Sequence, residues 1–290
     1  MTGFAVVDPA GIELGERPLW DAVNARLGWV DVYAGELRWL AGVAAGAEAE
    51  VWRFPRPLGA VALRRGGGVV AAAGDGIHFR DAWGRPDRKP LTGLLSDDLR
   101  FNDAACDPHG NLLCGTVAVD GARGRGSLYR VSPTGLVEII ESEVTESNGL
   151  GWSVDGATMY YVDSGEPAVR SYRYGPSTRP KRGRDLCAVA CDRGVPDGLC
   201  VDREGAVWVA LWAGGEVWRL SPDGALLQSL ITPVDRPTCP GFGGAQLDRL
   251  FVATAREGLD ETARAAQLWA GHLLVYDQPV AGAAAHAFGG

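Results

Sequence analysis

Residues 149–164 read GLGWSVDGATMYYVDS, which is an apolar segment, a turn at Asp155-Gly156 and a second apolar segment. The same order of features returns at 198–212, in GLCVDREGAVWVALW. Asp-Gly and similar pairs suit tight hairpins in which the glycine takes a positive φ. Each stretch therefore predicts two strands joined by a hairpin, and their likeness indicates an internal repeat.

Four further segments follow the same pattern. They are RPLWDAVNARLGWVDVYAGELRWL (17–40), GAVALRRGGGVVAAAGDGIHF (59–79), DAACDPHGNLLCGTVA (103–118) and GFGGAQLDRLFVATA (241–255). When the residues 17, 59, 103, 149, 198 and 241 are taken as equivalent, the steps are 42, 44, 46, 49 and 43 residues. A period of roughly 40–50 residues with several strands per repeat is typical of propeller blades.

The repeat predicts an all-β fold, a six-bladed β-propeller with four-stranded blades, as one domain over residues 1–290. The strand FAVVD (4–8) is expected to pair with the last strand, HLLVYD (272–277), because this pairing would close the ring and remove two exposed edges. A short helix within 256–268 would interrupt the last blade. The tail from about residue 281, rich in Ala and Gly, is expected to be loose.

Composition limits the class of protein. The net charge of −8 argues against a binder of nucleic acid or anionic membranes, which would need a basic face. The basic residues between 179 and 184 (Arg179, Lys181, Arg182 and Arg184) are expected in a solvated loop. There is no apolar run of about 18 residues that would predict a transmembrane helix.

The cysteines and the N-terminal stretch indicate a cytoplasmic protein. Six cysteines occur without a C-x-x-C pair, so we expect six reduced thiols and neither a zinc ribbon nor a thioredoxin motif. The first residues, MTGFAVVDPAGIELGE, lack the basic start and apolar run of a secretory signal. We expect a monomer or a weak homo-oligomer.

Polar residues recur at one position of the repeat, just before the innermost strand of a blade. They are Glu16, Asn102, Asn148 and Asp197. In a propeller, equivalent positions converge on the central axis, so these side chains are expected to share one pocket. Carboxylate and amide oxygens suit a divalent cation such as Ca²⁺, Mg²⁺ or Mn²⁺. For any one of the four, taken alone, the alternative is an ordinary turn, because Asn-Gly and Asp-Gly are common turn pairs.

Six motifs in this order resemble the SMP-30/gluconolactonase/luciferin-regenerating-enzyme family. They are G-E-x-P-x-W-D (15–21), R-F-N-D (100–103), S-N-G-L-x-W-S (147–153), P-D-G (196–198), P-T-x-x-x-F-G-G (237–244) and A-R-E-G-L (255–259). The resemblance runs from about residue 12 to 278. It implies a six-bladed propeller lactonase with one divalent metal ion, for which Ca, Zn, Mn, Mg and Fe all stay open.

The resemblance also implies roles for individual residues. The metal ligands fall on Glu16, Asn148 and Asp197, and the substrate contacts fall on Arg100 and Asn102. Asn102 could instead be a fourth metal ligand. A further acidic substrate contact, usually glutamate, falls on Asp120, whose side chain is about one methylene shorter.

The implied reaction is hydrolysis of a sugar-acid lactone by metal-activated water, with Asp197 as both ligand and general base. Arg100 or Asn102 would hydrogen-bond the developing oxyanion. Without the resemblance, Arg100 could equally form an ion pair with Asp97 or Asp98. The alternative functions are an esterase or phosphotriesterase on the same site, and a propeller that binds Ca²⁺ without catalysis.

Overall fold

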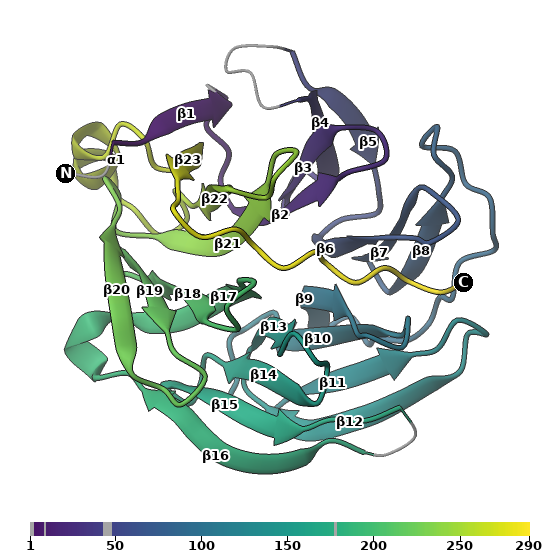
Figure 1. Ribbon diagram of the computed structural model, residues 1–290. Coiled ribbons are helices and arrows are strands. Elements are labelled where there is room, and N and C mark those ends of the chain that lie inside the picture. The colour runs from purple at the N-terminus through teal and green to yellow at the C-terminus, as the bar shows by residue number, and fades with distance from the viewer. Residues whose placement is uncertain (1–2, 9, 43–47, 177–178) are drawn as a thin grey trace.

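Six antiparallel sheets surround one axis in the computed structural model, which describes residues 3–8, 10–42, 48–176 and 179–290 (Figure 1). The six-bladed β-propeller predicted from the repeat is confirmed. The first strand of each sheet lies closest to the axis, where it contacts the first strands of its neighbours. Later strands follow outward in chain order, except in the last sheet, whose outermost strand comes from the N-terminal end of the chain.

The blades are numbered along the chain. Blade 1 has β2 (Gly15–Asp21), β3 (Arg26–Asp31), β4 (Glu36–Ala41) and β5 (Glu50–Arg53); blade 2 has β6 (Leu58–Leu63), β7 (Val69–Ala73) and β8 (Gly76–Arg80). Blade 3 has β9 (Leu99–Cys106), β10 (Leu112–Ala118), β11 (Gly126–Val131) and β12 (Val137–Val144); blade 4 has β13 (Ser147–Trp152), β14 (Thr158–Asp163), β15 (Ala168–Arg173) and β16 (Lys181–Ala188). Blade 5 has β17 (Val195–Val201), β18 (Val207–Trp212), β19 (Glu216–Leu220) and β20 (Leu226–Ile231); blade 6 has β21 (Pro237–Gly243), β22 (Arg249–Thr254), β23 (Leu273–Asp277) and β1 (Ala5–Asp8).

Blade 2 departs from the predicted four strands, since its sheet has three among the described residues. In place of a fourth strand, Leu91 forms an isolated bridge to Ile77. The segment that follows β8 contains Pro86 and Pro90, which lack the backbone N–H that a regular ladder needs.

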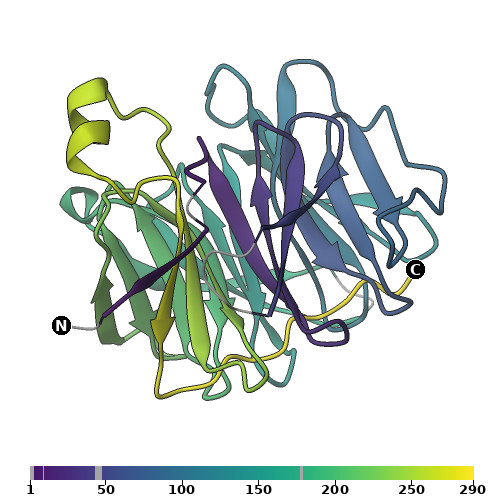
Figure 2. The ribbon, with the colours of Figure 1, turned by 90° about the horizontal axis from the view of Figure 1, so that it is seen from above.

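The two ends of the chain meet the ring in different ways. The strand β1 pairs antiparallel with β23, with Ala5 opposite Val275, so the predicted closure is confirmed. The tail, in contrast, is docked and not loose as predicted. It crosses the ring on one face, while α1 (Glu261–Ala266) lies at the opposite face (Figures 1 and 2).

One aromatic side chain explains the docking of the tail. Phe288 is fully buried between blades 2 and 3, and its N–H donates to Leu63 O at 2.8 Å. Earlier in the tail, Ala283 N donates to Val201 O of blade 5 at 3.0 Å. Composition alone suggested a mobile segment, but a buried phenylalanine and backbone pairing hold it.

Apolar clusters fill each of the six interfaces between neighbouring blades. Trp152 packs between blades 3 and 4, and Trp208 packs between blades 5 and 6. Burial of these faces is the main force that holds one blade against the next. The rigid ring fixes the positions of the innermost strands, on which the site is built.

The remaining features of the chain are peripheral. The predicted short helix is present as α1, with Asp260 Oδ1 accepting the Ala263 N–H at 2.8 Å as its N-cap. The basic segment lies largely on the outer strand β16, not in a loop as expected. All six cysteines are unpaired. Among the described residues no helix has both the length and the apolar character needed to cross a membrane.

Candidate functional site

The ladder register shifts near the start of the innermost strand in every blade. The shift falls between Glu16 and Leu19, Leu58 and Ala60, Phe101 and Ala104, Ser147 and Leu150, Pro196 and Leu199, and Pro237 and Cys239. Such bulges turn side chains out of the regular alternation and are common beside active sites. Here the same bulge is repeated six times around one axis.

Asn102, Asn148 and Asp197 lie within the bulges of blades 3, 4 and 5, whereas Glu16 pairs with Val30 as the last residue before the bulge of blade 1. At the bulges of blades 2 and 6 stand Gly59 and Thr238. Gly59 has no side chain, and the hydroxyl of Thr238 donates to Gly15 O at 2.5 Å. The predicted oxygen donors therefore come from four blades, and the backbone of Phe101 and Asn102 fills the space beside Gly59.

The glycines after two of these donors do not form turns. Gly149 lies within β13 and Gly198 within β17. A Cβ added at Gly149 would lie 2.5 Å from Asp197 O, and one added at Gly198 would lie 2.6 Å from the Cβ of Cys239. The glycines thus permit the close approach of neighbouring innermost strands, which brings Asn148 and Asp197 together.

The two predicted carboxylate ligands lie in an environment that opposes their ionisation. Burial raises the pKa of Asp197 well above its ordinary value, and the negative charges of Glu16, Glu146 and Asp103 add to this shift. Burial likewise raises the pKa of Glu16, with Asp103 as the second cause. Among the described residues, none donates a hydrogen bond to the buried Oδ1 of Asp197. Buried carboxylates that repel each other are stabilised when a cation binds between them.

Arg100 and Asn102 form one polar unit at the same site. The guanidinium donates from Nη1 to Asn102 Oδ1 at 2.6 Å and to Phe101 O at 3.3 Å. Asn102 in turn donates from Nδ2 to Ser147 O in blade 4, at 3.1 Å. The oxygen of Asn102 therefore holds a cationic side chain, which favours its role beside the substrate over a role as fourth metal ligand.

The alternative interpretation of Arg100, an ion pair with Asp97 or Asp98, does not hold. Asp98 bonds the Nη2 of Arg125 at 2.6 Å instead. Arg100 takes part in none of the ion pairs found within the described ranges. Its positive charge instead favours the ionised forms of Glu146 and Glu16, without a salt bridge to either among the described residues.

Asp120 is not joined to the other predicted residues by any contact in the described part of the chain. Its carboxylate is exposed and accepts the N–H of Ala122 at 2.9 Å, just after the end of β10. The pairing of Ala118 with Leu99 places that strand end beside the start of β9, on which Arg100 lies. Asp120 thus lies at the rim of blade 3.

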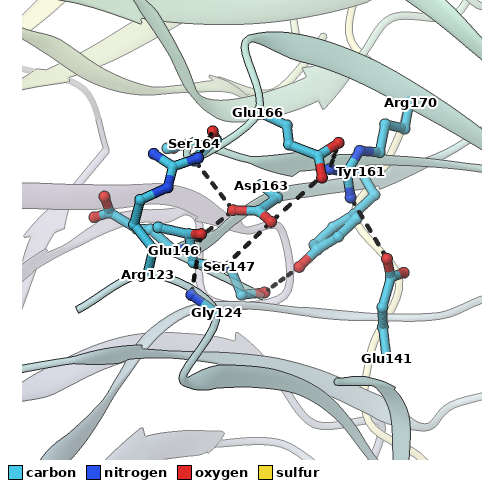
Figure 3. A network of polar contacts seen from close by, with 12 residues as sticks. Arg123, Gly124, Glu141, Glu146, Ser147, Tyr161, Asp163, Ser164, Glu166 and Arg170 are labelled. Atoms are coloured by element: carbon cyan, nitrogen blue, oxygen red, sulfur yellow. Dashed lines mark hydrogen bonds and ion pairs between the residues drawn. The ribbon is translucent and has the colours of Figure 1, made fainter. Parts of the chain in front are cut away.

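A network in blade 4 fixes the segment that carries Asn148 (Figure 3). The carboxylate of Asp163 accepts the backbone N–H of Glu146 at 3.0 Å, and Tyr161 donates its hydroxyl to Ser147 Oγ at 2.8 Å. The buried Arg170 lies 3.8 Å from Asp163 and 3.5 Å from Glu141. These contacts hold the backbone immediately before Asn148.

The amide of Asn148 is itself oriented by a neighbour. Its Nδ2 donates to Ser164 Oγ at 3.1 Å, and Ser164 donates to Pro196 O in blade 5 at 2.8 Å. With its nitrogen bound in this way, Asn148 presents its amide oxygen as the atom for a ligand. The link also ties Asn148 to the strand that carries Asp197.

The donor set fits a divalent cation of the hard class. It offers the buried carboxylate of Asp197, the half-buried carboxylate of Glu16 and an oriented amide oxygen, and one carboxylate oxygen lacks a partner among the described residues. The described ranges contain no group of three or more His, Cys, Asp or Glu side chains placed to hold a metal ion. Glu16, Asn148 and Asp197 are therefore the residues that would hold one, with water or substrate completing its coordination.

Sequence reasoning missed three charged residues of the site. Arg17 and Asp103 form an ion pair of 3.5 Å, with their side chains 16% and 4% exposed. Glu146 carries a pKa raised by burial, a shift that Arg100 opposes. Arg17 and Asp103 each directly follow a predicted donor in the chain, but the repeat pattern gives no sign of the contact between their blades.

Residues 14–256 match the model of a known family, described as the SMP-30/Gluconolactonase/LRE-like region. The chain belongs to this family. Two relatives are similar over most of their length. "Putative sugar lactone lactonase YvrE" of Bacillus subtilis (strain 168) is 33% identical over 268 residues, which cover 90% of this chain and 89% of that protein. Regucalcin of Homo sapiens is 34% identical over 262 residues, which cover 87% and 86%.

A solved structure agrees with the family assignment. The calcium-binding protein regucalcin of Agrobacterium tumefaciens superposes with a TM-score of 0.89 at 28% identity, covering 98% of this chain and 96% of that one. Membership of this family supports sugar lactone hydrolysis in general.

Proposed function

We propose that the protein is a metal-dependent lactonase that opens the ring of a sugar-acid lactone. The observation that carries the proposal is the pairing of two kinds of group at one end of the propeller axis. Glu16, Asn148 and Asp197 supply oxygen donors from three blades. Arg100, which Asn102 holds in place, supplies a hydrogen-bond donor for a substrate oxygen.

The metal ion, when bound, would polarise the lactone carbonyl and make a nearby water more acidic. Asp197 is the group placed to receive the proton of that water, because its Oδ1 has no other donor among the described residues. The water oxygen then bonds to the carbonyl carbon, and the endocyclic C–O bond breaks. The proton held by Asp197 passes to the departing ring oxygen, so the product is a hydroxy acid.

Arg100 and Asn102 act on the substrate side of the reaction. Their mutual hydrogen bond fixes the guanidinium, so its remaining N–H groups can donate to the oxyanion or to ring hydroxyls. Asp120, at the rim of the same blade, is placed to accept a hydrogen bond from a hydroxyl of a substrate long enough to reach it.

A screen of substrates and metals tests this function. Chelated protein would be assayed by pH-stat on several aldonolactones, a simple carboxylic ester and a phosphotriester, with each divalent ion restored in turn. We expect aldonolactones to be hydrolysed fastest. Preference for the ester or the phosphotriester would replace the lactonase assignment, and ion binding without turnover of any substrate would indicate a calcium-binding propeller.

A further inference from the structure

A second ring of residues lies directly after the donor ring. Glu16, Gly59, Asn102, Asn148, Asp197 and Thr238 form the first ring, and the residues that directly follow them in the chain are Arg17, Ala60, Asp103, Gly149, Gly198 and Cys239. Four of these are small and buried, while two are charged. The close contacts at Gly149 and Gly198 show how crowded the ring is for any larger side chain.

The two charged members come from blades that are not neighbours. Arg17 belongs to blade 1 and Asp103 to blade 3, yet their side chains meet at 3.5 Å. The side chain of Arg17 must therefore pass the position of Ala60 in blade 2. Its backbone has a φ of 50°, which is unfavourable for a residue with a side chain and is tolerated where the surroundings impose it.

The surroundings of the guanidinium place it near the axis. Besides pairing with Asp103, its charge opposes the rise that burial causes in the pKa of Cys239, Cys106 and Cys200, which come from blades 6, 3 and 5. It also interacts with the carboxylate of Glu16. One cation is thus surrounded by four of the six blades, directly behind the donor ring.

The charges of the two rings explain what this cation does. Glu16, Asp103 and Asp197 carry three negative charges when ionised, and Arg17 returns one positive charge. The remaining balance of two is what a single divalent ion neutralises. Unpaired buried charges are costly, so removing Arg17 would leave Asp103 in need of another cation.

We propose that Arg17 is a resident counter-cation that limits the site to one divalent ion and keeps Asp103 out of its coordination. It is a positioning residue, because it acts through Asp103 and Glu16 and not on the substrate. The inference rests on the proposed metal site but not on lactone hydrolysis, so ion binding and not turnover is its test.

The first experiment titrates chelated wild-type protein and Arg17→Met with Mn²⁺ and with Ca²⁺ by calorimetry. We expect one ion per wild-type chain. In Arg17→Met we expect the first ion to bind about tenfold tighter, because a positive charge beside it has gone, and a second ion to bind in place of the guanidinium.

Melting temperatures provide the second readout. Arg219→Met is the matched control, since Arg219 and Asp202 form a buried ion pair of similar exposure, 14% and 0%, at 2.8 Å and outside the two rings. Both variants should melt below wild type without metal. Divalent ions should raise the melting temperature of Arg17→Met far more than that of Arg219→Met.

A double variant covers the case in which Arg17→Met does not fold without metal. In Arg17→Met/Asp103→Asn both charges of the pair are absent, so we expect folding without metal, one bound ion and an affinity within about threefold of wild type.

Three results would overturn the inference. The first is that Arg17→Met binds the ion with the same affinity and stoichiometry as wild type. The second is that the double variant binds ions with the affinity and stoichiometry of the single variant. The third is that the wild-type chain binds no divalent ion. The third result would also contradict the proposed metal site, whereas ion binding without lactone turnover would contradict the lactonase proposal alone.

Discussion

At the scale of single residues, Asp197 carries most of the proposed chemistry. It is buried, it faces the negative charges of Glu16, Glu146 and Asp103, and its Oδ1 has no donor within the described ranges. Replacement of Asp197 by Asn keeps the shape but removes the proton acceptor. We expect kcat to fall by about 100-fold or more, as is usual when a general base is lost. Steady-state kinetics at saturating metal would show it, and near-normal turnover would contradict the assignment.

Arg100 is expected to act on substrate binding and not on stability. Because it forms none of the ion pairs in the described structure, Arg100→Met should change the melting temperature little. Loss of a charge-assisted hydrogen bond should lower kcat/KM by about tenfold or more. Arg125→Met is the matched control, because it breaks an exposed pair with Asp98 nearby on blade 3. Equal kinetic losses in both variants would show that Arg100 has no special role.

Some residues of the site can be predicted from the sequence and others cannot, and the difference has a physical cause. Asn102, Asn148 and Asp197 are detectable because the repeat places one oxygen donor at one register position, and the bulge keeps that position at the axis. Arg17 and Asp103 are not, because their meaning depends on a contact between blades 1 and 3. A pattern read along one blade cannot show a side chain that reaches a different blade.

At the scale of elements, the segment before Asn148 is held by the blade 4 network. Asp163 accepts three backbone N–H groups there, from Thr145, Glu146 and Gly165. We expect Asp163→Asn to lower the free energy of unfolding by about 2–4 kcal/mol, since charged hydrogen bonds weaken and Arg170 loses a partner. Hydrogen exchange of residues 145–148 should speed up together with a loss of turnover.

Tyr161→Phe is a control for Asp163→Asn that should destabilise the same network less. It removes the single hydrogen bond to Ser147 Oγ, and we expect a cost of about 1 kcal/mol. If Asp163→Asn were no more damaging than Tyr161→Phe, in exchange and in denaturant unfolding alike, the network would not be what positions Asn148.

The docked tail should respond to pH. His286 packs against Trp152, and burial lowers the pKa of His286 below its ordinary value. Docking thus favours the neutral imidazole ring. The contribution of His286 to docking is therefore fully present above about pH 6.5 and is lost as pH falls through the lowered pKa. Hydrogen exchange of residues 281–290 at pH 7.5 and pH 5 should show this loosening. His286→Gln should remove most of the difference in exchange between the two pH values. If that difference stayed the same, other titrating groups would be its cause.

The hairpins could be predicted from the sequence, whereas the docking of the tail and the missing strand of blade 2 could not. Hairpins were predictable because Gly156 and Gly205 stand where a positive φ is needed. The docking of the tail was not, since it depends on one phenylalanine finding a space between blades 2 and 3. The missing fourth strand of blade 2 followed from prolines that the repeat pattern ignores.

At the scale of the whole molecule, the ring is what turns a repeated residue into a site. Apolar clusters lock each blade to the next, and pairing of β1 with β23 joins the two ends. Six bulges then surround one axis, where polar residues from different blades can act together. The substrate is not fixed at this scale, because rim groups such as Asp120 lie in loops outside the repeat.

The most direct test follows ion binding and lactone opening in the same titration. Chelated wild-type protein, shown by elemental analysis to be metal-free, would be titrated with a divalent ion while acid release from an aldonolactone is recorded. We predict no turnover at the start, and a rate that rises in proportion to bound ion until one ion per chain is reached. Turnover in the metal-free protein, or none at full occupancy, would contradict the account.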